Sequence, residues 1–63
     1  FAYACVVAVK SIFAGEKFTK MNIWVKRPGT GEIKAKEYFR VLGKKAKVDI
    51  QKNEQIQRRQ IGE

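Results

Sequence analysis

Three stretches of the chain have the apolar pattern of β-strands. Residues 2–10 alternate and are rich in Val and Ala, which predicts a strand that is buried on most sides. Residues 23–26 predict a second, short strand, and residues 44–50 alternate Lys with Ala, Val and Ile, as a half-exposed strand does. We therefore expect a mostly β domain with short strands.

Helical periodicity is confined to short segments. In residues 35–42 the apolar side chains have the spacing of a helix face, and Gly43 is suited to end that helix. Residues 18–22, with Thr19 as a cap, and residues 57–61 predict single helical turns.

The sequence contains an internal repeat. Shifted forward by 38 positions, residues 8–23 overlay residues 46–61. Gly15 then falls on Asn53, and both residue types tolerate a left-handed turn. The identical pairs are Ala8 and Ala46, Ile12 and Ile50, Glu16 and Glu54, and Ile23 and Ile61. The repeat predicts a pseudo-two-fold domain in which each unit covers the other's apolar face; chance similarity in a Lys-rich sequence is the alternative.

Composition limits the chemistry that the chain can perform. It has 63 residues, 14 Lys or Arg, 6 Asp or Glu and no His, so the formal net charge is +8. This length fits a single domain over residues 1–63, and no apolar run approaches the roughly 20 residues that span a bilayer. Since the chain starts at Phe1 and not at Met, we expect it to be a piece of a longer protein.

Cysteine and acidic residues give no reactive site. A lone Cys5 and the lack of His exclude an internal disulfide and a Cys/His zinc site, and indicate a reducing, cytoplasmic setting. Cys5 lies in an apolar run, so we expect it in the core. The carboxylates are scattered among Lys residues and form no visible acid–base pair. We therefore expect no catalytic residue and no metal site in this domain.

The loop Arg27-Pro28-Gly29-Thr30-Gly31 is the first candidate for binding chemistry. It lacks the Gly-Lys-Ser/Thr ending of a phosphate-binding P-loop, so a turn is the simpler interpretation. Pro28, however, restricts Arg27 to an extended conformation at the end of a strand. An Arg held in this way presents five donors to a carboxylate, phosphate or carbonyl oxygen.

The basic surface is the second candidate. Several cations could follow a phosphate backbone: Lys44, Lys45, Lys47, Arg58 and Arg59. Trp24, Tyr38 and Phe39 could stack on bases, although their spacing fits core packing equally well. In a core this small we expect Trp24 and Phe18 to be the most important apolar side chains.

Together these segments resemble a known family. The matching residues are 12–16, 18–19, 22–23, 25–31 and 42–46, and the most specific of them are the Lys-Arg-Pro-Gly-Thr-Gly residues 26–31. They closely resemble the C-terminal antifreeze-like domain, also called the SAF domain, of bacterial sialic acid synthases. The resemblance extends from about Val6 to Ile61.

The resemblance implies a β-clip fold, shared with fish type III antifreeze proteins, in which short strands and single helical turns wind about a pseudo-two-fold. It implies a parent enzyme whose N-terminal TIM barrel is absent from this chain. Such synthases condense phosphoenolpyruvate with N-acetylmannosamine or a related sugar, using a divalent metal, manganese or magnesium, held outside this domain.

The resemblance also implies a partner and a role for one residue. Such synthases form domain-swapped homodimers, in which this domain caps the TIM barrel of the partner subunit. Arg27, presented by Pro28, Gly29, Thr30 and Gly31, would reach into the partner's active site and contact the sugar's N-acetyl group. The sugar stays open between N-acetylmannosamine and legionaminic or pseudaminic acid precursors.

A stand-alone basic binding module is the alternative function. One version binds nucleic acid through the cations and aromatic residues above. The other binds ice, as the fish proteins do, but the matching face would carry Lys10, Lys17 and Lys20, which retain their hydration shells.

Overall fold

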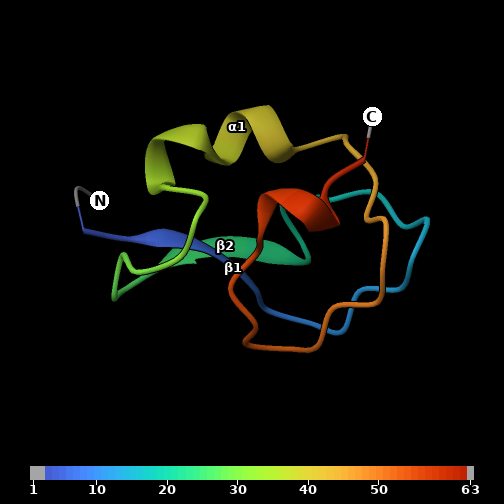
Figure 1. The fold of residues 1–63 in the computed structure, drawn as a ribbon, viewed down its shortest axis with the longest axis horizontal. Coiled ribbons are helices and arrows are strands. Elements are labelled where there is room, and N and C mark those ends of the chain that lie inside the picture. Colours follow the sequence, from blue (N-terminus) through green and yellow to red (C-terminus); the bar gives the residue numbers. More distant parts are fainter. Residues whose placement is uncertain (1–2, 63) are drawn as a thin grey trace.

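The central strand of the fold is β1 (Cys5–Ala8), and all four of its residues are buried. The computed structural model describes residues 3–62, so Ala2, the first residue of the expected strand, lies outside the described part. β1 pairs antiparallel with β2 (Ile23–Lys26), with Cys5 opposite Lys26 and Ala8 opposite Ile23 (Figure 1). The prediction of a buried strand is confirmed, over a shorter range.

β2 alternates as its sequence predicts. Ile23 and Val25 are buried against the core, while Trp24 and Lys26 are exposed on the opposite face. Trp24 is 49% exposed, so the expectation that it lies in the core is wrong. The alternation of a strand with period two places Trp24 on the outer face whenever Ile23 and Val25 face inward.

A short helical segment packs over this sheet. A 3₁₀ turn, η1 (Ala35–Glu37), continues directly into α1 (Tyr38–Val41), which confirms the helix predicted for residues 35–42 (Figure 1). Tyr38 and Val41 are the buried residues of α1. Gly43 ends the segment at a φ of +87°, a left-handed conformation in which glycine is unstrained.

The segment 44–50 does not form the predicted strand. Two of its isolated bridges, from Lys45 to Lys17 and from Ile50 to Ile12, join it to residues 12–17 in one antiparallel register, and a third runs from Ala46 to Ile61. A turn at residues 14–15 and bends at residues 47–48 separate the first two bridges, so no continuous ladder forms. The turn predicted at 57–61 is present as η2 (Arg58–Gln60). The turn predicted at 18–22 is present as a single hydrogen-bonded turn, in which the Asn22 and Ile23 N–H groups donate to Thr19 O at 3.2 Å and the Thr19 hydroxyl accepts the Met21 N–H at 3.1 Å.

Ile12 and Ile50 pair with each other through two reciprocal backbone hydrogen bonds, of 2.8 and 2.7 Å. Around this pair, the backbone hydrogen bonds occur twice at a spacing of 38 residues, the spacing of the sequence repeat. The matched bonds are Gly15 N–H to Ala46 O and Asn53 N–H to Ala8 O, Ala46 N–H to Glu16 O and Ala8 N–H to Glu54 O, and Phe18 N–H to Lys44 O and Ile56 N–H to Val6 O. Each unit therefore supplies the hydrogen-bond partners of the other.

Side chains close the corresponding turns in the same way. Glu16 Oε1 accepts the Phe13 N–H at 2.7 Å, and Glu54 Oε1 accepts the Gln51 N–H at 3.0 Å. Both turns contain a residue of positive φ, Gly15 at +93° in the first and Asn53 at +75° in the second.

Buried amide side chains complete both units. Asn22 Oδ1 accepts the Thr19 N–H at 2.8 Å, and Gln60 Oε1 accepts the Gln57 N–H at 2.7 Å. Gln60 is only 1% exposed, and its amide nitrogen donates to Glu54 Oε2 at 2.8 Å. These polar groups are satisfied, so their burial carries little penalty.

The first prediction compares aromatic side chains. Phe18 is fully buried in the core, so Phe18→Ala should lower the free energy of unfolding by about 3–5 kcal/mol, a large share of a small domain's stability. Trp24→Ala should cost clearly less, because about half of that side chain already faces solvent. Urea unfolding followed by circular dichroism measures the loss of unfolding free energy in both variants. Phe13→Ala, at a side chain that is 63% exposed, is the control, with a change within about 0.5 kcal/mol. Equal losses for Phe18 and Trp24 would contradict the burial pattern.

The second prediction concerns pH. The Gln51 N–H and the Gln60 amide, which donate to Glu54, lower the pKa of its carboxyl group from the ordinary value. The ionised carboxylate therefore stabilises the fold above the ordinary glutamate pKa, and this contribution is lost as the pH falls through the lower folded pKa. The melting temperature of Glu54→Gln should thus fall less than that of the unaltered chain between pH 6 and pH 3. The melting temperature of Lys52→Gln, which alters the same turn, should fall as much as that of the unaltered chain. If the melting temperatures of all three proteins fell equally with pH, the assignment to Glu54 would be refuted.

Candidate functional site

Arg27 lies at the bend that directly follows β2. It is exposed, and within residues 3–62 its guanidinium makes no hydrogen bond or ion pair. All five of its N–H donors are therefore available to a binding partner. The Arg27–Pro28 peptide bond is cis.

The loop after Arg27 rests directly on the start of β1. A Cβ atom added to Gly29 would lie 2.7 Å from the backbone carbonyl carbon of Tyr3, which is closer than real Cβ contacts occur. One added to Gly31 would lie 2.9 Å from the sulfur of Cys5. Both glycines are therefore needed for close approach, which is why the loop contains them at alternate positions.

Three polar contacts hold the same loop. The Cys5 thiol donates to the Pro28 carbonyl at 3.3 Å, and the Lys34 ammonium donates to the Gly29 carbonyl at 2.6 Å. The amide of Gln55 donates to the Thr30 hydroxyl at 2.8 Å. The loop after Arg27 is thus held at its backbone by β1 and by the segment before η1, and at the Thr30 side chain by the second repeat unit.

The sequence identified the loop but missed the side chains that hold it. Cys5 is fully buried, as expected, and in addition contacts the loop at two positions. Lys34 and Gln55 had no signal in the sequence, because a surface Lys or Gln looks the same whether or not it meets a carbonyl or a hydroxyl. Only the fold brings residues 34 and 55 next to the loop.

The aromatic residues proposed for base stacking pack on one another. The Trp24 and Tyr38 rings meet edge to face with centroids 5.4 Å apart, and the Tyr38 and Phe39 rings do so at 5.2 Å. Tyr38 is only 5% exposed, so its ring offers no free face to a base. Phe39 is 76% exposed and Trp24 about half exposed.

The basic residues proposed for phosphate contact are partly engaged. Arg58 donates to both carboxylate oxygens of Glu37, at 2.9 and 3.1 Å, and this partner is the main reason that the pKa of Glu37 is lowered. Arg59 donates to the Gln57 side chain at 2.7 Å. Among residues 3–62, no group of three or more His, Cys, Asp or Glu side chains could hold a metal ion. No helix in that part of the chain is long and apolar enough to cross a membrane.

Comparisons with known proteins agree with this fold. The family model described as the SAF domain matches residues 3–61. A solved structure, an antifreeze-protein-like domain in the human N-acetylneuraminic acid phosphate synthase gene, matches with a TM-score of 0.89 and 24% sequence identity, covering 98% of this chain and 78% of that chain. No curated protein matches this chain. The antifreeze-like fold expected from the sequence is confirmed.

The third prediction tests how tightly the loop is packed on Cys5. Gly31→Ala should lower the free energy of unfolding by about 1–3 kcal/mol, because the new methyl group overlaps the Cys5 side chain. Adding Cys5→Ala removes the sulfur, so the double variant should lose less than the sum of the two single losses. The free energies come from denaturant unfolding of all four proteins. Strict additivity would mean that the loop does not touch Cys5.

Proposed function

The chain belongs to the SAF domain family, and on that premise we propose that it is the substrate-capping and dimer-forming domain of a sialic acid synthase. The parent enzyme would condense phosphoenolpyruvate with N-acetylmannosamine or a related amino sugar. This domain would supply no catalytic residue of its own. It would close the TIM barrel of the partner subunit in a cytoplasmic homodimer and insert Arg27 into that subunit's active site.

The observation that carries this proposal is the state of Arg27. Its guanidinium is exposed and unpartnered among the described residues, whereas the loop that follows it is held by Cys5, Lys34 and Gln55. A charged donor on a fixed support loses little conformational freedom when it binds. That combination suits a residue delivered to a ligand in another subunit.

The N-acetyl group of the sugar fits the donor set of Arg27. Its carbonyl oxygen accepts hydrogen bonds, and bonds from a charged donor are about twice as strong as those between neutral groups. The class of parent is supported by the antifreeze-like domain in the human N-acetylneuraminic acid phosphate synthase gene, which shares the fold.

In this proposal, this domain supplies positive charge and the TIM barrel holds the metal. The net charge of +8 raises the local concentration of anionic phosphoenolpyruvate near the covered barrel. The divalent metal, manganese or magnesium, would be held by the barrel and not by this domain.

The fourth prediction is made for the full-length parent synthase. Arg27→Ala should lower kcat/KM for the amino sugar by roughly 100-fold, because a charge-assisted contact to the substrate is lost. KM for phosphoenolpyruvate should change little. Arg27→Lys should recover only part of the activity, because an ammonium group lacks the planar fork. Steady-state kinetics with each substrate varied in turn gives these values.

Its control separates a binding role from a structural one. Lys20→Ala removes one exposed cation from another turn and should leave both kinetic constants unchanged. Dimer mass and melting temperature should be the same for all variants. Unchanged kinetics in Arg27→Ala, with the dimer intact, would refute the role of Arg27 and leave the loop as a turn only.

A further inference from the structure

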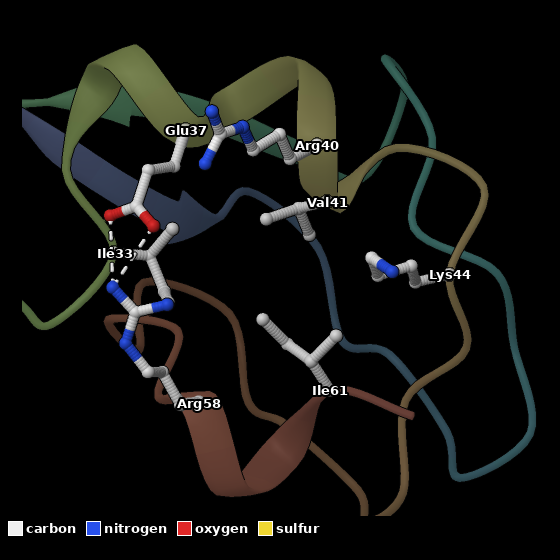
Figure 2. A pocket seen from close by; sticks show the side chains of 7 residues that line it. All are labelled: Ile33, Glu37, Arg40, Val41, Lys44, Arg58 and Ile61. Carbon is white, nitrogen blue, oxygen red and sulfur yellow. Dashed lines mark hydrogen bonds and ion pairs between the residues drawn. The ribbon is translucent and has the colours of Figure 1, made fainter. Parts of the chain in front are cut away.

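A cleft of about 270 Å³ lies between α1 and η2. Three aliphatic side chains point toward its centre, namely Ile33, Val41 and Ile61 (Figure 2). Ile33 and Val41 belong to the core and are almost fully buried, so they form a rigid apolar floor. The residues that line this cleft include none of the loop Arg27–Gly31.

One side of the cleft is charged. An adjoining hollow of about 410 Å³ is lined by Lys36, Glu37, Arg40 and Arg58, and the last three also line the cleft. The two spaces therefore form one groove that is apolar at one end and charged at the other. Lys44 adds a further cation beside the apolar end.

Among the described residues that line this groove, positive charge exceeds negative charge. Glu37 is its only carboxylate among the lining residues, and it is already paired with Arg58 at 2.9 Å and with the Lys34 N–H at 3.2 Å (Figure 2). Arg40 is exposed, and among the described residues its guanidinium has no hydrogen bond or ion pair, although its charge helps to lower the pKa of Glu37. Its side chain extends along the wall of the cleft toward Glu37 (Figure 2).

We propose that this groove binds an extended acidic peptide segment, with an aliphatic side chain on Ile33, Val41 and Ile61 and a carboxylate on Arg40. A small inorganic anion would leave the apolar floor exposed to water, and a purely apolar ligand would leave Arg40 without a hydrogen-bond acceptor. Side chains two residues apart lie on the same face of an extended peptide, so the aliphatic and acidic residues are separated by one residue. This binding is independent of the role proposed for Arg27.

The probe is the peptide acetyl-Asp-Ser-Leu-Ser-Asp-amide, which presents a carboxylate on either side of Leu and so fits the groove in either chain direction. Titrated into the isotope-labelled 63-residue chain, it should shift the amide resonances of residues 33, 37–44 and 58–61, with a Kd of about 1 mM. The peptide with Asn in place of both Asp residues, and the peptide with Ala in place of Leu, should each bind about tenfold more weakly.

Two protein variants locate the site. Arg40→Gln should weaken binding of the probe by about tenfold, whereas Lys52→Gln, which removes the same charge from a distant turn, should change it by less than twofold. The amide spectra of both variants, before peptide is added, should remain those of the folded chain.

Three results would overturn the proposal. The first is an absence of shifts at 10 mM probe. The second is equal weakening by the two substitutions, which would mean diffuse attraction to a cationic surface. The third is binding of sodium acetate to the same residues as tightly as the probe, which would mean a site for any carboxylate and no peptide groove.

Discussion

The fold depends on satisfying the backbone of one buried strand on both of its edges. β1 is covered by side chains on all sides, so none of its N–H and C=O groups can bond to water, and each unpaired group would carry a large penalty. One edge pairs with β2. The other receives two separate segments: Val6 donates to Ile33 O in the first, and in the second Ile56 donates to Val6 O and Asn53 donates to Ala8 O. The loops that reach β1 are ordered because they form backbone hydrogen bonds with this buried strand.

The need to pair the backbone groups of β1 also explains how a binding loop is held rigid in so small a protein. The segments recruited to the second edge of β1 include Lys34 and Gln55, which form bridges with Cys5 and Val7. Once there, their side chains reach Gly29 and Thr30 in the loop beside Arg27. Support for the loop is therefore a consequence of pairing the central strand, and it requires no extra element.

The sequence predicts those features that depend on local pattern. The alternation in residues 23–26, the helical spacing in residues 35–42 and the left-handed positions Gly15 and Gly43 each follow from a few neighbouring side chains. The strand expected at 44–50 is not formed, because alternation indicates an extended chain and does not specify a partner for it. The expectation that Trp24 lies in the core is wrong because Trp24 stands between two inward-facing residues of a strand, and this position decides its direction whatever its size.

The candidate site was predictable only in part, for a related reason. Arg27 could be chosen from its own neighbours, since Pro28 and the glycines that follow mark a loop. The contacts that hold the loop involve partners 5 to 25 residues away, and those separations appear only after folding. The same holds for the groove between α1 and η2, whose floor and cations come from four separate parts of the chain.

The arginine residues fall into two groups: some bond to neighbouring residues and maintain the fold, and the others remain available to partners. Arg58 bonds to Glu37 and Arg59 to Gln57, and both contacts secure η2 against neighbouring residues. Arg27 and Arg40 have no such bond among residues 3–62. In a chain with a net charge of +8, each added cation increases self-repulsion, so a surface Arg without a hydrogen bond contributes little to folding. Arg27 precedes a tightly packed loop, and this setting suits a sugar that carries a carbonyl group. Arg40 lies beside the apolar floor of the groove, and this setting suits an acidic peptide.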